Sequence, residues 1–354
     1  MDLRKDKIRA EALRLGFSFI GFSKPCQTPH FQAYESWVKE LQQKELEYLK
    51  KKYVIEARNE PKAILENVRT VIVVGKAYSK PVLPITANIS EYHKFGQIAA
   101  YACLPDYHRW FKDRSRELIK FMNGLGYSSG KIKFFVDSGP VMEKDFAFQA
   151  GLGWIGKNSL FISPRFGSLC LLGCLFVDFD LKADVPDETD LCGECDLCIR
   201  SCPTQAISNK RTVAVSRCIS FLTTNTKGDI PLDLCMKVGD HVFGCDICQS
   251  VCPLNRDIPD IKISQSDILA PIINEKIDLL PEMFISERSY FEKYSPTPIG
   301  KLPHEVFLRN LIIAAGNSGE GTLIGPLKDL IRIHPSFVVQ NAANWAISAI
   351  DRTK

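Results

Sequence analysis

The chain has 354 residues, of which 45% are hydrophobic and 24% charged, and its formal net charge is +4. This length allows two or three domains, each with its own core, in an ordinary globular composition. The mild basic bias is compatible with a nucleic-acid partner but does not by itself indicate one. No run of about 18 apolar residues occurs, which excludes a membrane-spanning helix.

The N-terminal segment, Met1 to Gly16, mixes charged residues with spaced Leu, Ile and Ala. This pattern predicts an amphipathic helix rather than a signal peptide, so we expect a cytoplasmic protein. The chain has 13 cysteines, and nine of them fall between positions 192 and 252. In a reducing compartment such cysteines favour metal ligation over a disulfide framework.

Alternating strand and helix patterns extend to about residue 180. Buried strands are predicted at 70–75, 131–137 and 169–179, and helices at 106–126 and 143–150, which indicates an α/β or α+β domain. An acidic, proline-containing linker at 184–190 then leads into the cysteine block. From about Pro303, apolar residues at helical spacing predict packed helices that resemble HEAT repeats, although a small helical cap fits equally well.

The cysteine block carries the most specific pattern. A run ending in Cys202-Pro203 has the C-x2-C-x2-C-x3-C-P spacing of two-cluster ferredoxins, whose fourth cysteine ligates the other cluster. A second run ends in Cys252-Pro253 but has Val242 at its first ligand position, and Cys218 is the available substitute. This crossed scheme assigns to the first [4Fe–4S] cluster Cys192, Cys195, Cys198 and Cys252, and to the second Cys202, Cys218, Cys245 and Cys248.

A pair of four-cysteine zinc sites is the alternative, because paired C-x2-C motifs also bind zinc. Two runs that both end in Cys-Pro fit cubanes better.

Two adjacent clusters form an electron relay, so the nearly 190 residues before the block are expected to hold the acceptor or substrate. Apolar neighbours suggest that the remaining cysteines are core residues. These are Cys26, Cys103, Cys170, Cys174 and Cys235.

Segment 151–156 matches the GxGxxG dinucleotide fingerprint but follows a helical pattern, whereas the fingerprint normally follows a strand. We therefore favour a glycine-rich loop that closely approaches some other bulky cofactor. The polar residues after this loop, Lys157, Asn158 and Ser159, are candidate contacts.

Asp137 ends a predicted strand just before a tight turn, a common place for a catalytic acid. A capping role in the turn is the commoner explanation on sequence alone. Arg58 could pair with a phosphate or an acidic cofactor edge, but a surface salt bridge is the commoner role. The cluster from Tyr107 to Arg109 fits solvated packing at the start of a helix.

Four segments together resemble the epoxyqueuosine reductase family, and the resemblance covers the whole chain. Members of that family are cobalamin-dependent iron–sulfur enzymes related to reductive dehalogenases. They remove the epoxide oxygen from epoxyqueuosine at the tRNA wobble position, which is the last step of queuosine synthesis. The segments are Val136-Asp-Ser-Gly-Pro140, Gly151-Leu-Gly-Trp-Ile-Gly-Lys-Asn158, Arg217-Cys-Ile-Ser-Phe-Leu-Thr223 and Gly244-Cys-Asp-Ile-Cys-Gln-Ser-Val-Cys-Pro253.

The resemblance implies that the N-terminal domain binds cobalamin and that the clusters reduce its cobalt towards Co(I). Cobalt would act on the epoxide carbocycle while an acid, Asp137, protonates the leaving oxygen; two electrons and two protons then give the alkene and water. The other cobalamin contacts that it implies are Arg58, Trp154, Lys157, Ser159, Ser220, Thr223 and Asp246. No histidine stands in a DxHxxG signature, so we expect no histidine ligand on the lower face of cobalt.

The expected architecture is an α+β multidomain chain. An α/β-type cobalamin-binding domain would span 1–182, a ferredoxin-like two-cluster domain 183–260, and a HEAT-like helical domain 261–354. The implied partners are tRNA with epoxyqueuosine in its anticodon loop, whose base would be splayed into the pocket, and an unidentified electron donor. We expect a monomer and no membrane contact.

Two other functions remain open. A small-molecule reductase of the dehalogenase type would use the same cofactors, whereas an electron carrier with a large docking domain would hold clusters without a corrinoid.

Overall fold

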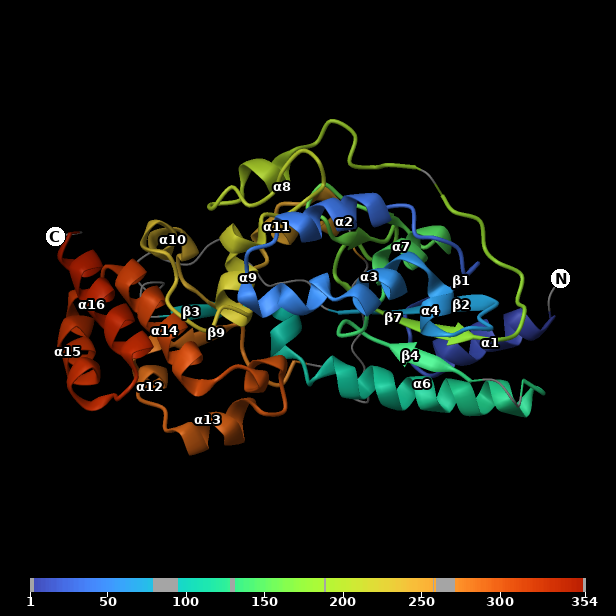
Figure 1. Ribbon diagram of the computed structural model, residues 1–354. Coiled ribbons are helices and arrows are strands. Elements are labelled where there is room, and N and C mark those ends of the chain that lie inside the picture. The colour runs from blue at the N-terminus through green and yellow to red at the C-terminus, as the bar shows by residue number, and fades with distance from the viewer. Residues whose placement is uncertain are drawn as a thin grey trace.

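The computed structural model describes residues 3–78, 95–127, 131–187, 189–256, 258 and 271–352. A four-stranded sheet with helices around it lies toward one side of the view, and a group of C-terminal helices lies at the other (Figure 1). The sheet has the order β1-β2-β7-β4. Its strands are β1 (Phe19–Ser23), β2 (Thr70–Ala77), β7 (Cys170–Val177) and β4 (Lys133–Phe135).

Alternate side chains of β2 enter two different cores. Ile72 and Val74 pack beneath α1 (Leu3–Arg14) and α6 (Tyr107–Gly124). Val71 and Val73 point to the opposite face and join the core that includes α7 (Glu143–Gln149). Successive strand side chains face opposite sides of a sheet, so a strand covered on both faces is a continuous apolar run. This confirms the strand and helices predicted here, with small changes at their ends.

All neighbouring strands in this sheet are antiparallel. The expectation of an α/β-type domain is therefore corrected to α+β. The error has a physical cause: the alternation of helices and strands shows that connections are helical, but it does not fix the direction in which the chain returns to the sheet. Smaller elements complete this region. They are α2 (Phe31–Glu40), η1 (Lys44–Lys50), α3 (Lys52–Asn59), α4 (Pro61–Ile64), η2 (Ala100–Cys103), β5 (Trp154–Ile155) and β6 (Phe161–Ile162).

A second, three-stranded sheet joins distant parts of the chain. Its central strand β3 (Phe95–Ile98) pairs parallel with β8 (His241–Phe243) and antiparallel with β9 (Lys276–Asp278). One strand thus comes from each of the three predicted domain ranges. The division at 182/183 and 260/261 stays a prediction, and the second boundary lies outside the described residues.

The cysteine block is built from short helical turns separated by loops. They are α8 (Leu197–Arg200), η3 (Val215–Arg217), α9 (Ile219–Thr224), α10 (Leu232–Val238), α11 (Ile247–Ser250) and η4 (Pro253–Asn255). Of the five remaining cysteines, Cys103, Cys174 and Cys235 are buried and Cys170 is partly buried. Cys26 is exposed, so the expectation of a core residue is wrong there; it precedes a loop rather than a packed element.

The C-terminal helices pack around α14 (His304–Ser318), which is buried from Val306 to Gly316 and ends at Gly319 with a left-handed φ of 68°. The chain leaves the helical conformation again near Pro335. Its neighbours are α12 (Leu279–Met283), α13 (Glu287–Tyr294), η5 (Pro298–Lys301), η6 (Gly321–Leu323), α15 (Ile324–Ile333) and α16 (Phe337–Asp351). Within the described residues, every helix is too short or too polar to span a membrane.

Candidate active site

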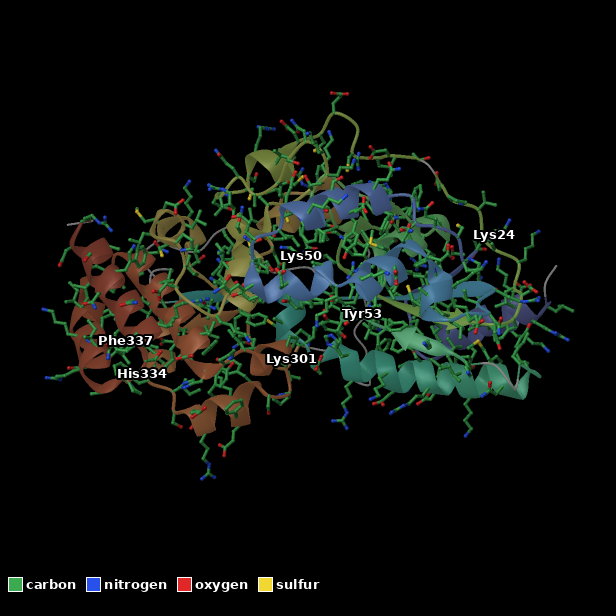
Figure 2. All side chains as sticks on the ribbon, in the orientation of Figure 1. Lys24, Lys50, Tyr53, Lys301, His334 and Phe337 are labelled. Atoms are coloured by element: carbon green, nitrogen blue, oxygen red, sulfur yellow. The ribbon has the colours of Figure 1, made fainter. Side chains whose placement is uncertain are left out.

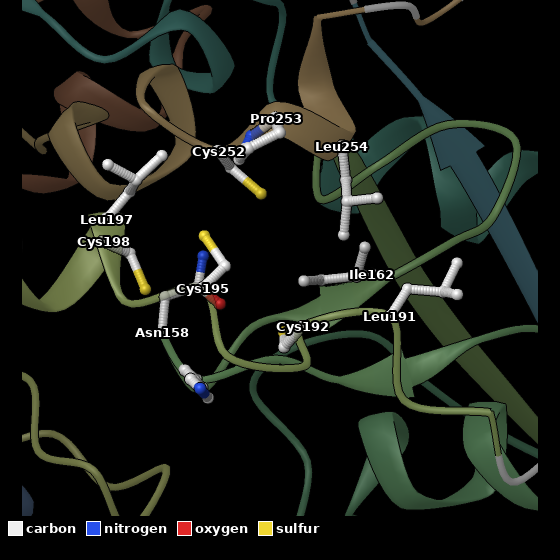
Figure 3. A pocket seen from close by; sticks show the side chains of 11 residues that line it. Asn158, Ile162, Leu191, Cys192, Cys195, Leu197, Cys198, Cys252, Pro253 and Leu254 are labelled. Atoms are coloured by element: carbon white, nitrogen blue, oxygen red, sulfur yellow. The ribbon is translucent and has the colours of Figure 1, made fainter.

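Four cysteines line one pocket at the edge of the cysteine block. They come from both runs: three from the first and Cys252 from the second. Figure 3 shows the side chains of Cys195, Cys198 and Cys252 directed toward the same hollow. Apolar neighbours such as Ile162 and Leu254 complete the wall, and this thiol-lined pocket suits an iron–sulfur cluster. The four are Cys192, Cys195, Cys198 and Cys252.

Four of the other cysteines of the block, Cys202, Cys218, Cys245 and Cys248, form a second group. Burial raises the pKa of the Cys245 thiol to about 12, and the nearby Cys218 and Cys202 raise it further. Burial likewise raises the pKa of Cys248 well above its usual range, with contributions from Cys245 and Cys218. Thiols this crowded and desolvated stay protonated unless a positively charged metal group offsets the charge of the thiolates.

A zinc site and a cubane differ in how close together their sulfur ligands must lie. Tetrahedral zinc holds its sulfurs at about 2.3 Å, so they lie roughly 3.8 Å apart. In the described part of the chain, no three His, Cys, Asp or Glu side chains gather closely enough to hold a single metal ion. A cubane carries its irons at separate corners and therefore needs ligands that are farther apart. Cys198 also contributes to the raised pKa of Cys248, which places the two groups near each other.

Asp137 follows β4 and adopts a left-handed φ of 56°, a conformation that Asp and Asn tolerate better than most residues. The Tyr107 hydroxyl donates a 2.8 Å hydrogen bond to Oδ2 of Asp137. Nε2 of His108 lies 3.6 Å from the same oxygen. The Asp137 side chain is 66% exposed, so its carboxylate remains accessible to a bound substrate or cofactor.

His108 links Asp137 to a chain of charged groups. Its Nδ1 lies 2.7 Å from Oδ1 of Asp106, the residue that caps α6. Lys301, from η5 in the C-terminal region, lies 2.9 Å from Oδ2 of Asp106. Desolvation lowers the pKa of His108, but the bonds to Asp106 and Asp137 outweigh it and raise the pKa to about 9. The two carboxylates thus favour the protonated form of His108, while Nζ of Lys301, 2.9 Å from Nδ1, opposes it.

The pKa of Asp137 is lowered, whereas desolvation alone would raise it. The hydrogen bond from His108 lowers it most, desolvation opposes this, and the bond from Tyr107 lowers it further. Desolvation and the Asp137 charge raise the pKa of Tyr107 far above its usual range. Two groups that can carry a proton, the Tyr107 hydroxyl and the His108 ring, therefore face the same carboxylate oxygen of Asp137.

Arg58, Glu143 and Trp154 each carry a buried polar atom without a hydrogen-bond partner. Arg58 donates to the Gly139 carbonyl at 3.4 Å, while its Nε is buried without a partner. Oε1 of Glu143 and Nε1 of Trp154 are likewise buried and unpaired. Burial raises the pKa of Glu143 to about 8, against the opposing effects of its own backbone N–H and Arg58. Buried polar groups normally have partners, so these atoms fit a group that binds here.

Comparison with known proteins agrees with both halves of this site. Residues 191–255 match the family model for a 4Fe-4S double cluster binding domain, and residues 58–138 match Epoxyqueuosine reductase QueG, DUF1730. The epoxyqueuosine reductase of Vibrio cholerae is 34% identical over 315 residues, which cover 88% of this chain and 83% of that protein. The chain belongs to the epoxyqueuosine reductase family. It is accordingly an oxidoreductase with a double-cluster domain.

Solved structures of epoxyqueuosine reductases have the same fold. One, crystallised with an epoxyqueuosine-modified stem loop of tyrosine tRNA, is 28% identical, with a TM-score of 0.85 and coverage of 98% of this chain and 90% of that one. Another, from Bacillus subtilis, is 27% identical with a TM-score of 0.83 and equal coverage. In that second structure the loop of the catalytic aspartate is swung out of the active site.

The glycine-rich segment 151–156 joins α7 to β5, which is a helix-to-strand connection and not the strand-to-helix turn of a dinucleotide site. A Cβ at Gly151 would lie 2.3 Å from the Val185 carbonyl, so the glycine permits close approach of the linker. Of the contacts predicted after this loop, Lys157 donates to the Gly193 carbonyl at 2.6 Å, beside the first cysteine group. Asn158 lines that same pocket, and the Ser159 carbonyl accepts from Lys144 at 2.7 Å.

The predicted contacts near the second cysteine group are already engaged within the protein. The buried Thr223 hydroxyl donates to the Ile219 carbonyl at 2.8 Å and accepts from the Gly244 N–H at 3.0 Å. Asp246 accepts from the Ala100 N–H at 2.7 Å and from Gln249. The Ser220 carbonyl accepts from the Thr224 hydroxyl at 2.8 Å. The Thr223 and Asp246 side chains and the Ser220 backbone thus hold the segments beside Cys218 and Cys245.

Sequence reasoning missed the partners of Asp137. Tyr107 and His108 were taken for solvated packing, and Lys301 and Glu143 were not considered. One signal was available, because Asp106, Tyr107 and His108 place three functional side chains within the first turn of a helix. Nothing in the sequence, however, indicates that this turn meets the end of β4.

Proposed function

We propose that this chain reduces epoxyqueuosine to queuosine at the wobble position of tRNA, with Asp137 delivering a proton to the leaving epoxide oxygen. The observation that carries the proposal is the contact of one accessible carboxylate with both the Tyr107 hydroxyl and the His108 imidazolium. Opening an epoxide to an alkene and water consumes two electrons and two protons. The carboxylate can relay a proton from His108, whereas the raised pKa of Tyr107 keeps the phenol proton in place and lets that hydroxyl orient Asp137.

We further propose the crossed ligand scheme for the clusters. Cys192, Cys195, Cys198 and Cys252 would hold the first, supported by the pocket that they share. Mutual effects on thiol pKa support the second set. That set is Cys202, Cys218, Cys245 and Cys248.

Cobalamin is the proposed second cofactor, bound between Asp137 and the second cluster. When bound and reduced through the clusters, it would supply the two-electron chemistry at the epoxide carbons. The buried, unpartnered Nε of Arg58 and Nε1 of Trp154 support their predicted roles as contacts. Glu143 offers a third unpaired atom and joins the set. Ser159, Ser220, Thr223, Asp246 and Lys157 would act mainly by holding loops, as their present bonds indicate.

The tRNA would approach Asp137 from the side of Lys301. This lysine is 54% exposed and pairs with Asp106, so a phosphate could take it as a partner without entering the site. Figure 2 shows Lys50, Tyr53 and Lys301 toward the middle of the view, between the sheet and the C-terminal helices. Tyr53 is an exposed aromatic ring on which an unstacked base could rest. The C-terminal helices would form HEAT-like repeats that extend this surface. We also propose that the protein is a monomer in the cytoplasm.

The deciding experiment uses anaerobically purified protein with both cofactors present. We expect conversion of epoxyqueuosine to queuosine in tRNA, and a corrinoid absorption spectrum in addition to that of the clusters. Turnover of an organohalide without conversion of tRNA would favour the dehalogenase-type alternative. Cluster absorption without binding of added cobalamin would favour an electron carrier.

A further inference from the structure

Arg309 lies at the centre of the interface between α14 and the cysteine block. Its side chain is fully buried, with 0% exposure. The guanidinium donates to the carbonyls of Leu222 at 2.8 Å and Thr226 at 2.7 Å, and also to that of Gly228. Its partners are backbone oxygens and an amide rather than a carboxylate. Desolvation lowers the pKa of Arg309 only to about 10, so a full positive charge is buried here.

Asn310, the next residue, extends this contact to a second segment. Its Oδ1 accepts from Arg309 at 2.7 Å. Its Nδ2 donates to the carbonyls of Thr223 and Val242, both at 2.8 Å. One fully buried amide therefore ties the end of α9 to the end of β8. Because every polar atom of this pair is used, its geometry fixes the separation of the two segments.

Both segments lead directly to cysteines of the second group. Leu222 lies one helical turn from Cys218, about 6 Å along the axis of α9, and its N–H bonds to the Cys218 carbonyl at 2.9 Å. Two residues after Val242 comes Gly244, whose N–H is held by the Thr223 hydroxyl, and Cys245 follows it. A Cβ at Gly244 would lie 2.5 Å from the Ala99 side chain, so this loop has little freedom of its own.

We propose that Arg309 and Asn310 are positioning residues for the second cluster, holding Cys218 and Cys245 at the spacing that the cluster needs and stabilising its reduced form. The inference rests on the proposed crossed ligand scheme. Reduction adds a negative charge to the cluster, and a buried cation about a helical turn beyond a ligand favours that charge in a medium of low dielectric constant. The C-terminal helices thus affect the electron relay through α14.

The same helix offers a matched control. Asn317, two turns beyond Asn310, donates in the same way to two carbonyls, those of Cys235 and Gly239, at 2.8 and 2.9 Å. These carbonyls belong to α10 and the residue that follows it, a segment that contains none of the eight proposed ligands. Loss of Asn317 should therefore cost stability in a similar way without acting on a cluster ligand.

The experiment compares Arg309→Gln, Arg309→Lys, Asn310→Ala and Asn317→Ala in the full chain, purified anaerobically. Iron content and the midpoint potential of each cluster, followed by electron paramagnetic resonance, are measured beside thermal unfolding. Wild type should contain about eight iron atoms per chain. We expect Asn310→Ala to lose iron toward about four, whereas Asn317→Ala retains about eight.

The charge is tested separately from the bonds. Arg309→Gln should shift the potential of one cluster to more negative values and leave the other unchanged, while Arg309→Lys restores most of that potential. An unchanged potential in Arg309→Gln, or equal iron loss in Asn310→Ala and Asn317→Ala, would overturn the proposal. If Arg309→Gln does not fold, the lysine and Asn310 variants decide alone. Wild type with a single cluster would instead contradict the crossed ligand scheme.

Discussion

The cysteine block and the Asp137 site are organised in opposite ways. The cysteines sit on short turns and loops, and their thiols are crowded and desolvated, so their arrangement is unfavourable until a metal group binds. The Asp137 network is instead complete within the protein. Tyr107, His108 and Asp106 stand on the long helix α6, and their hydrogen bonds exist without any cofactor.

This difference predicts how the two regions respond to mutation. Removing one thiol from the block should destroy a binding site and disturb the loops around it, because the cluster holds these loops together. Removing one member of the Asp137 network should change proton transfer and leave both the fold and the cofactors in place. The four predictions below test this contrast, from the largest expected effect to the smallest.

Cys218→Ala should cause the largest loss. Cys218 is the proposed ligand that lies outside both sequence runs, and without it the second cluster would lack a corner. We expect iron to fall from about eight to about four atoms per chain and tRNA reduction to be abolished, because the electron path is interrupted. Iron analysis and a turnover assay measure both. The exposed Cys26→Ala is the control, and it should retain full iron and activity; full iron in Cys218→Ala would refute the crossed scheme.

Asp137→Asn should lower turnover by about 10²- to 10⁴-fold, the usual contribution of a general acid. Asparagine tolerates the left-handed backbone conformation of this position, so the loop should keep its shape. Iron and corrinoid content should therefore match wild type, unlike in Cys218→Ala. Asp113→Asn, an exposed carboxylate on the same helix as Tyr107, serves as the control. Wild-type turnover in Asp137→Asn would remove Asp137 from the mechanism.

The same contrast explains what could be read from the sequence. Cluster ligands must reach one small object from adjacent loops, so their spacing along the chain is itself a signal, and the missing position in the second run led to the prediction that Cys218 replaces it. The partners of Asp137 carry no such spacing. His108 and Asp137 are 29 positions apart, and Lys301 reaches Asp106 from the C-terminal region, so only tertiary packing brings them together. Strand direction was likewise undetermined, because apolar periodicity is the same in parallel and antiparallel sheets.

His108→Gln tests whether the imidazolium supplies a proton to Asp137. We expect turnover to fall by about tenfold to a hundredfold at neutral pH. The pKa of His108 is raised to about 9, so the charged form is present below that pH and is lost above it. Wild-type turnover should decline as pH rises through about 9, and His108→Gln should lack this decline. Arg109→Gln, at the next position, should keep the wild-type profile. An unchanged profile in His108→Gln would show that the imidazolium only orients Asp137.

Glu143→Gln should have the smallest effect and one visible mainly in stability. Burial raises the pKa of Glu143 to about 8 from an ordinary value of 4.5, so the folded protein holds a proton that the unfolded chain releases. The contribution of this carboxyl to stability is full below about pH 4.5 and is lost progressively as pH rises toward 8. Glutamine keeps the neutral shape at every pH, so thermal unfolding should depend less on pH in this window. Glu117→Gln, exposed on α6, should retain the wild-type dependence.

Added cobalamin provides a second test of Glu143, because a cofactor that binds Oε1 should stabilise wild type more than Glu143→Gln. Equal stabilisation would remove Glu143 from the proposed contacts.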